Sequence, residues 1–346
     1  MVGVAVWQFL LPKGPQFAGR TLTIITWGGP WKEATETYAK KFAEEFGVEV
    51  KIELHGGPSS VGLSKLRSAW PNPIFDVMMM TSAVGFQGAV EGFFVELTEE
   101  NLPVLKEIPD VFEGKLDGKT YWVAMYPYVG TIVYRTDLVP FEIKSFQDLL
   151  KPELKGKIAV PYPTYLPGSW LIAASIPKGG DERNLDPGFE FAKQLAESGN
   201  IGYVFKSDSD VLRLLETGEA WVGWTLTGNA YTLAKKGVPV KAVLEFEDTK
   251  PVAFFDVIAV VDGPNKDVAL AFVNWLLQPE NLGGFTKMLG YVPSHPEAEV
   301  DPEVAKWNIP ADQMSEKAYV PDFLYLAENV DKWATKWDTE ITPLLG

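Results

Sequence analysis

The chain has 346 residues, no cysteine and a formal net charge of −15, with 46% hydrophobic and 22% charged residues. Such a length exceeds what one hydrophobic core usually serves, and the composition is that of a globular protein, so two lobes are expected. The acidic balance argues against nucleic acid as a partner, because phosphate binding needs clustered lysine and arginine. The lack of cysteine excludes disulfides and thiolate sites, and the two histidines, His55 and His295, lie too far apart in the sequence to suggest a shared metal.

The N-terminus carries an apolar run at residues 2–11, which is followed by Pro12, Gly14 and Pro15. About ten apolar residues are too few to cross a bilayer but match the core of an export signal or anchor. We interpret residues 1–19 as the remnant of such a segment, with an ordinary N-terminal strand as the alternative. The protein is therefore expected outside the cytoplasmic membrane, in the periplasm or at the cell surface, free or tethered by its N-terminus.

Strands and helices alternate in the region before residue 82. A β-branched run at 21–27 predicts a buried strand, and Pro30 stands where the first turn of a helix tolerates proline. An apolar residue recurs every four positions up to Phe46, and Gly47 ends that helix. The following strand, short helix and strand are expected at 48–54, 63–70 and 76–80. This order predicts a parallel, doubly wound sheet.

Two extended apolar runs flank a second α/β region. The first, at 122–133, is interrupted by Pro127 and Gly130, and the second, at 254–261, is a strong β run. Between and after them, the spacing predicts strands at 157–160 and 202–204 and helices at 169–176, 189–198, 265–277 and 323–337.

The most informative stretch is 214–240, which reads as helix, stop, short buried strand, polar loop, helix and strand. Ser207 or Asp208 can cap the first helix, and Gly218 occupies a left-handed C-terminal cap position. Gly228 and Asn229 open the next helix directly after a strand. In open α/β sheets, a strand end that meets a helix N-terminus is where small molecules bind.

The order of this stretch, together with five other segments, resembles the extracellular solute-binding proteins of ABC importers, specifically the spermidine/putrescine-binding-like branch. These segments are residues 21–29, 75–82, 145–158, 254–256 and 290–293. The resemblance implies an α/β fold of the type II periplasmic-binding-protein kind, with two doubly wound lobes joined at a hinge. It also implies a monomeric receptor without enzymatic activity or cofactor, which captures a small solute and delivers it to the transmembrane subunits of an ABC permease.

In that fold the chain crosses twice between the lobes. We expect the crossings near Tyr128 and Asp256. The first lobe would then comprise 20–127 and 258–297, and the second lobe 128–257 and 298–346, including the C-terminal helices.

Candidate ligand-binding residues of the first lobe follow two of the predicted strands. Trp27 offers a flat face, and Gly28 and Gly29 allow a ligand to approach the backbone closely. A glycine-rich turn with a packing tryptophan is the alternative. Thr81 and Ser82 carry hydroxyls that either contact a ligand or cap the next helix.

Candidates in the second lobe are Tyr162, Thr164, Tyr165, Thr227 and Asn229. In the polyamine-binding relatives, the loop after the corresponding strand carries acids, but the matched positions here hold Tyr162, Pro163 and Leu166. The stacking tryptophan of those relatives is replaced by Leu226. Both departures argue against a polyamine with several charges.

The resemblance also marks Asp256 as a contact for a ligand amine and Tyr291 as a further contact. An aspartate between apolar β residues is costly to bury unpaired. It is therefore either paired with a hinge lysine or arginine, or available to a cationic ligand.

These features predict a receptor for a small organic cation or zwitterion. The alternatives are an oxyanion receptor that uses helix N-termini after Gly29 and Gly228, or, less favoured, a carbohydrate hydrolase with an acid pair. The sequence contains no nucleophile elbow, phosphate-binding loop or HExxH motif, so no catalytic or metal-binding residue is predicted.

Overall fold

The structure is a computed structural model in which residues 16–345 are described. The apolar run at 2–11, and with it most of the predicted export or anchor remnant, lies outside these residues. Within them, no helix combines the length and the apolar character that a bilayer crossing requires.

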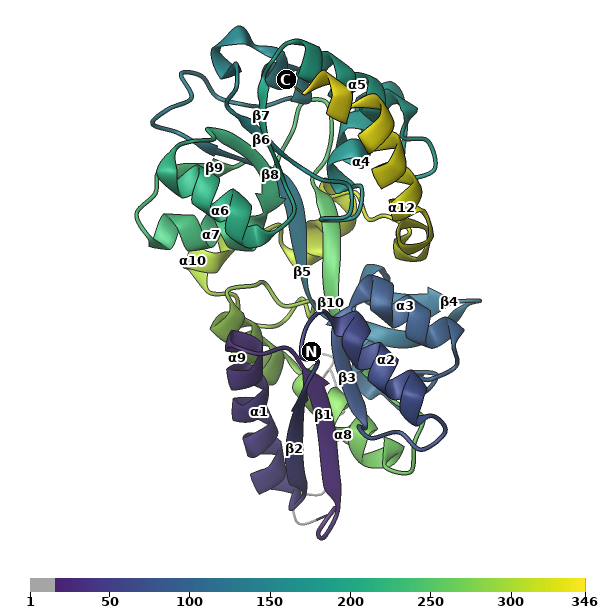
Figure 1. Cartoon of the computed structure of the whole chain (residues 1–346). Helices are drawn as coiled ribbons and strands as arrows, with labels where there is room; N and C mark the ends of the chain where they lie inside the picture. The colour runs from purple at the N-terminus through teal and green to yellow at the C-terminus, as the bar shows by residue number, and fades with distance from the viewer. Residues whose placement is uncertain (1–15, 346) are drawn as a thin grey trace, which may run out of the picture.

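Two long antiparallel strands join an upper and a lower body of the molecule (Figure 1). These strands are β5 (Lys119–Arg135) and β10 (Val252–Val260), which pair from Val252 opposite Gly130 to Ile258 opposite Val123. One sheet passes through both bodies, in the order β2-β1-β3-β10-β5-β8-β6-β7. The lower body is called the first lobe below, and the upper body the second lobe.

The first lobe contains β1 (Thr21–Thr26), β2 (Glu49–Leu54) and β3 (Val77–Thr81), which run parallel. Its helices are α1 (Pro30–Phe46), α2 (Ser59–Ala69), α3 (Ser82–Val90), α8 (Lys266–Leu276) and α9 (Pro279–Leu289). The apolar face of α1 predicted from the sequence is buried, and the ring centroid of Phe42 lies 5.2 Å from that of Phe272 in α8. Gly47 ends α1 in the left-handed conformation, with a φ of 71°.

The second lobe contains the parallel strands β6 (Ile158–Pro161), β7 (Ile201–Phe205) and β8 (Val222–Leu226), and β9 (Val240–Ala242) pairs with β5. Its helices include α4 (Ser169–Ser175), α5 (Asp186–Glu197), α6 (Asp208–Thr217), α7 (Thr227–Lys235) and α12 (Phe323–Glu340). Ser207, rather than Asp208, caps α6, and Gly218 ends it with a φ of 75°. The carboxylate of Asp208 is therefore not used as the helix cap.

The break expected at Pro127 and Gly130 does not occur, because β5 continues through both residues. Gly130 has a packing role: a Cβ atom there would lie 3.0 Å from Nε1 of Trp224, which donates a hydrogen bond to Ser169 Oγ (2.9 Å). The sheet is also mixed, since β10 runs antiparallel to β3 and to β5. The exact lobe boundaries given above stay a prediction.

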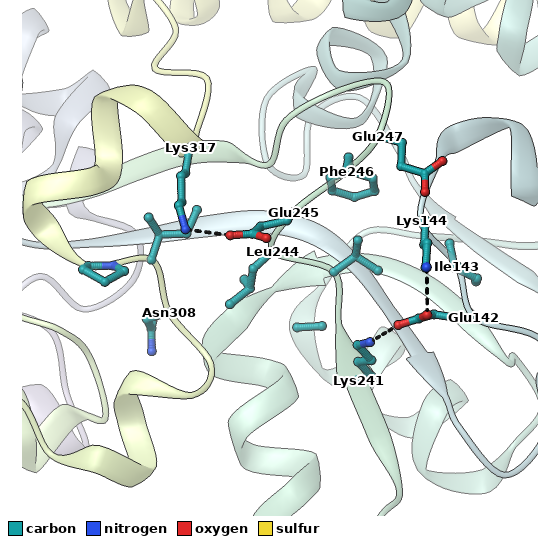
Figure 2. A pocket seen from close by; sticks show the side chains of 14 residues that line it. Glu142, Ile143, Lys144, Lys241, Leu244, Glu245, Phe246, Glu247, Asn308 and Lys317 are labelled. Carbon is teal, nitrogen blue, oxygen red and sulfur yellow. Dashed lines mark hydrogen bonds and ion pairs between the residues drawn. The ribbon is translucent and has the colours of Figure 1, made fainter.

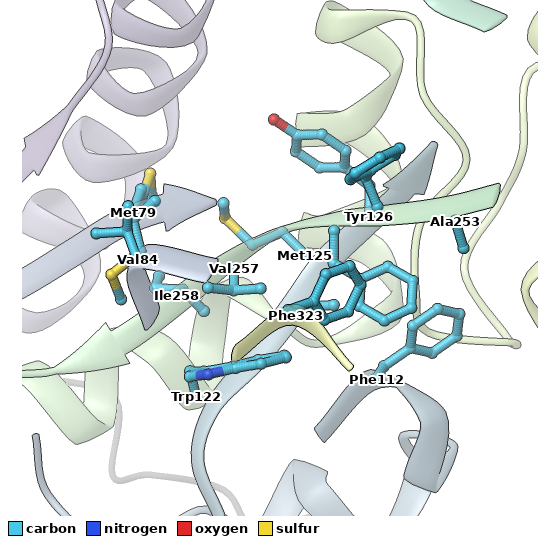
Figure 3. Close-up of a cluster of buried hydrophobic side chains, with 14 of the residues drawn as sticks. Met79, Val84, Phe112, Trp122, Met125, Tyr126, Ala253, Val257, Ile258 and Phe323 are labelled. Atoms are coloured by element: carbon cyan, nitrogen blue, oxygen red, sulfur yellow. The ribbon is translucent and has the colours of Figure 1, made fainter. Parts of the chain in front are cut away.

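The two faces of the β5–β10 pair have different characters. Successive residues of a strand point to opposite faces, so Asp256 lies on one face and Phe255 on the other. The Phe255 ring packs 5.3 Å from Phe112 and 5.4 Å from Phe323, between centroids. Figure 3 shows Phe112, Trp122 and Phe323 on the side of the strands opposite to Tyr126. An apolar core thus packs against the face of the crossing strands that is opposite to Asp256.

The core behind these strands predicts a stability effect at Gly114, in β4 (Glu113–Leu116). A Cβ atom there would lie 2.0 Å from the Trp122 ring. We expect Gly114→Ala to lower the free energy of unfolding by about 1–3 kcal/mol through overpacking. Urea unfolding measures the effect, with Gly28→Ala as the control because no atom lies within 4 Å of its added Cβ. Equal stability of the two variants would contradict the packing described here.

Candidate functional site

Asp256 lies where the two lobes meet, and the residue is 6% exposed. In the sheet it stands opposite Thr81 of β3 and Tyr126 of β5. The Tyr126 hydroxyl donates to Asp256 Oδ2 (2.6 Å), and the Tyr128 hydroxyl donates to Oδ1 (3.1 Å). No lysine or arginine of the described residues acts on this carboxyl, so the pairing with a hinge cation considered above is not present there.

Burial raises the pKa of Asp256 to about 6, from an ordinary value of 3.8, although the two tyrosine hydrogen bonds partly oppose that shift. At neutral pH the group is therefore a carboxylate that has lost water without gaining a positive partner. Such a charge is stabilised by any cation that reaches it.

Aromatic rings surround this carboxylate. Tyr291 stacks on Tyr126 with centroids 4.7 Å apart and an interplanar angle of 6°, and its centroid lies 5.7 Å from that of Tyr128. Trp31 Nε1 donates to the Tyr126 hydroxyl (2.7 Å), and the Trp27 ring lies 6.1 Å from Trp31. Burial, and next the charge of Asp256, raises the pKa of Tyr126, Tyr128 and Tyr291, so the phenols stay protonated hydrogen-bond donors.

His55 packs against the ring of Trp27. The two rings meet edge to face at 5.3 Å, and His55 Nε2 lies 2.8 Å from the carbonyl oxygen of Met79. Burial lowers the pKa of His55, so the ring is neutral at pH 7 and Nε2 carries the proton that it donates to the carbonyl. We interpret His55 as a packing residue.

The second lobe approaches this group at the start of α7. A Cβ atom at Gly228 would lie 2.9 Å from Tyr291 Oη, so only glycine allows that approach without displacing the ring. The neighbouring Asn229 donates through Nδ2 to Thr225 Oγ1 (2.8 Å) and to Asp208 Oδ1. Tyr165 Oη donates to the same carboxylate oxygen (2.5 Å).

The other predicted residues have different surroundings. Thr81 Oγ1 lies 3.3 Å from Ser59 Oγ, and Ser82 is buried as the first residue of α3. The Thr227 hydroxyl donates to Asn308 Oδ1 (3.2 Å), and the Tyr162 hydroxyl donates to Asp338 of α12 (2.9 Å). Three further predicted residues are exposed, namely Gly28, Gly29 and Thr164.

The structure thus brings Thr81, Asp256 and Tyr291 together at the crossing strands, and Trp27 is linked to them through Trp31. Asn229 and Tyr165 meet at Asp208 in the second lobe. Tyr162 is directed toward α12 instead. Sequence reasoning did not select four residues of this region: Trp31, Tyr126, Tyr128 and Asp208. The two tyrosines are two positions apart on a predicted strand, and Asp208 follows a strand end, so a signal was present for these three.

A surface pocket of about 600 Å³ lies elsewhere on the second lobe (Figure 2). Glu142 pairs there with Lys144 (3.2 Å) and with Lys241, and Glu245 pairs with Lys317 (2.6 Å). Because these charges neutralise one another, the pocket offers a ligand little net charge.

Within residues 16–345, no group of three or more histidine, aspartate or glutamate side chains could hold a metal ion.

A family model described as bacterial extracellular solute-binding protein matches residues 37–311 of the chain. The chain belongs to this family. It is 25% identical to spermidine/putrescine-binding periplasmic protein 1 of Haemophilus influenzae over 296 residues, which are 83% of this chain and 79% of that protein. The structure of an ABC transporter protein from Clostridium perfringens matches with a TM-score of 0.79 and 26% identity, covering 93% of this chain and 100% of the other. An extracellular solute-binding protein from Bordetella parapertussis gives a TM-score of 0.81 at 19% identity, covering 94% and 99%.

These relatives confirm several predictions from the sequence: the family, the two-lobed α/β fold, and the absence of enzymatic activity. The hydrolase alternative has no support among them. As a solute-binding protein of an ABC importer, the protein binds a small solute outside the cytoplasm and delivers it to a permease. The monomeric state and the N-terminal tether stay predictions.

The burial of Asp256 predicts how stability depends on pH. Its pKa is raised in the folded state, so the neutral carboxyl stabilises the fold below about pH 3.8, and this contribution is lost as the pH rises through about 6. We expect Asp256→Asn, relative to wild type, to gain about 1–3 kcal/mol of unfolding free energy between pH 4.5 and 7.5. Urea unfolding of the ligand-free solute-binding protein at both pH values measures this gain.

The control for this experiment is Asp262→Asn, which neutralises an exposed carboxylate just beyond the same strand. Its stability should follow that of wild type across the pH range. A pH-independent difference between wild type and Asp256→Asn would show that the carboxyl is not destabilised by burial.

Proposed function

We propose that this solute-binding protein captures a small organic cation where the two lobes meet, with the cationic group of the solute on Asp256. The observation that carries the proposal is a buried carboxylate that receives two tyrosine hydrogen bonds and no positive charge from the described residues. A carboxylate in that setting is complementary to an ammonium group.

The aromatic residues around Asp256 fit the same ligand. Tyrosine and tryptophan faces attract cations by about 0.5–2 kcal/mol each and also contact an aliphatic chain. Trp27, Trp31 and Tyr128 are each only partly buried, so their rings remain available for contact. The relative from H. influenzae, named as spermidine/putrescine-binding, is consistent with an amine ligand.

An oxyanion is the competing solute. The N-terminus of α7 at Gly228 and the hydroxyl of Thr81 would favour it, but Asp256 would repel it. A zwitterion satisfies Asp256 through its amine and needs a positive or hydrogen-bond-donating environment for its other end. The carboxylate thus supports a cationic group in the solute, whichever chemistry the rest of it carries.

Delivery to the permease follows from the two-lobed architecture. A solute that touches both lobes stabilises the closed arrangement by the difference between its affinities for the closed and the open state. Asp256 lies on β10, where the two lobes meet, and Gly228 lies on α7 of the second lobe, so a solute between them would touch both lobes. The ligand-free protein is therefore expected to be largely open.

The first test is calorimetric titration with a panel of amines, amino acids and phosphates. We expect Asp256→Asn to weaken binding of a cationic solute by at least about 1.5 kcal/mol, because a charged hydrogen bond is lost, and to leave anions unaffected or bound more tightly. Asp262→Asn is the matched control and should bind as wild type does. Unchanged or improved binding of amines by Asp256→Asn would refute the proposed function.

The pKa of Asp256 gives a second test. Because this pKa is raised to about 6 without ligand, a cation must displace a proton from the carboxyl below that pH. Affinity for a permanently charged cation should fall about tenfold for each pH unit below 6 in wild type and stay flat in Asp256→Asn. Titration with a quaternary ammonium compound between pH 4.5 and 7.5 measures this, and a flat wild-type profile would contradict it.

A further inference from the structure

Asp208 is a second carboxylate at the junction of the lobes. It is the first residue of α6, and its Oδ1 accepts hydrogen bonds from Tyr165 Oη (2.5 Å) and from Asn229 Nδ2. These two donors come from the loop after β6 and from the start of α7, so the Asp208 carboxylate links three separate segments of the second lobe. Oδ2 of the same carboxylate has no such partner among the described residues.

A short path of contacts links Asp208 to Asp256. Asn229, which binds Asp208, is the neighbour of Gly228, and Gly228 faces the Tyr291 hydroxyl. The Tyr291 ring in turn stacks on Tyr126, which donates to Asp256. Tyr291 thus stands between the two acids, and the charges of both raise its pKa, after the larger effect of burial.

The simplest alternative is that Asp208 only stabilises the N-terminus of α6. That position is already occupied: Ser207 accepts from the backbone N–H of Asp210 (3.3 Å), and the Asp210 carboxylate accepts from the Ser207 hydroxyl (2.7 Å). The Asp208 side chain turns away from this cap toward α7. A purely local role leaves that orientation, and the two donors that hold it, unexplained.

Nearby positive charge does not neutralise Asp208. Lys206, two residues earlier, has its Nζ 4.2 Å from the centroid of the Tyr162 ring. Among the ion pairs of residues 16–345, those of α6 join Arg213 to Glu219 and Lys236 to Glu216, and Asp208 takes part in none. The second lobe therefore presents an exposed carboxylate that is held by neutral donors, and its charge, like that of Asp256, acts on the Tyr291 hydroxyl.

We propose that Asp208 determines the specificity of the receptor by binding a second cationic group of the solute, with Tyr165 and Asn229 as positioning residues. This inference rests on the proposed function, in which Asp256 binds the first cationic group. The solute would then be positive at both ends, and a zwitterion would be disfavoured because its carboxylate would face Asp208. The acids that the sequence lacks at positions 162, 163 and 166 would be replaced by one from α6.

The experiment compares three probes with four carbons each: 1,4-diaminobutane, butylamine and 4-aminobutanoic acid, together with their five- and six-carbon homologues. Calorimetric titration should show wild type binding at least one diamine about ten- to a hundredfold more tightly than its monoamine, as expected for a second charged hydrogen bond. Asp208→Asn should reduce this preference to less than about threefold while monoamine affinity stays unchanged.

Two further variants separate a specific contact from a general effect. Asp210→Asn removes the same charge from the same helical turn and should keep the diamine preference. Tyr165→Phe keeps the charge but removes one hydrogen bond to Asp208, so a reduction of the preference smaller than in Asp208→Asn is expected. Thermal melting of each variant checks that it is folded.

The outcomes distinguish this inference from the proposed function. If Asp208→Asn keeps the diamine preference, or if wild type binds no diamine more tightly than its monoamine, the role of Asp208 is wrong although Asp256 can still bind a cation. Loss of monoamine and diamine binding to the same degree in Asp208→Asn also overturns it. If Asp256→Asn binds every probe as wild type does, the proposed function itself fails.

Discussion

The antiparallel pairing of β5 with β10 is the constraint on which the rest of the molecule depends. Both strands continue from one lobe into the other, so their register fixes which residues of the two lobes can meet. The register skips Met125, placing Tyr126 opposite Asp256 and Ala124 opposite Val257. This bulge brings two tyrosines and an aspartate to one face and leaves Trp122, Phe255 and Val257 to the apolar core on the other.

The same pairing explains why a carboxylate is tolerated at a buried position. Two phenols donate to Asp256, which offsets part of the lost hydration, but neither supplies a charge. In the unliganded protein, part of the free-energy cost of burying this negative charge therefore remains uncompensated. A bound cation compensates it. Aromatic contacts, rather than flexible lysines or arginines, hold the carboxylate of Asp256, so its immediate surroundings need little rearrangement when the lobes close on a solute.

Much of the fold could be predicted because it depends on local signals. The helix from Pro30 to Phe46, the stop at Gly218 and the strand-to-helix turn at Gly228 all follow from periodicity and cap chemistry, and the structure has them at or within a residue or two of the expected positions. Asp256 and Tyr291 were selected through the family resemblance. Pro127 and Gly130 misled the prediction, since their effect depends on the neighbouring strand and on Trp224 rather than on the local sequence.

By itself, the sequence determined the two-lobed α/β class and the strand ends where helices begin, because these depend on the order and spacing of neighbouring residues. Its resemblance to known proteins also determined the solute-binding family. Only the tertiary structure decided which side chains share a site. Tyr126 and Asp256 are 130 positions apart, and Asn229 and Asp208 are 21 apart. Contacts of this kind depend on strand register, on one bulge and on how α6 and α7 pack, and none of these can be read from local patterns.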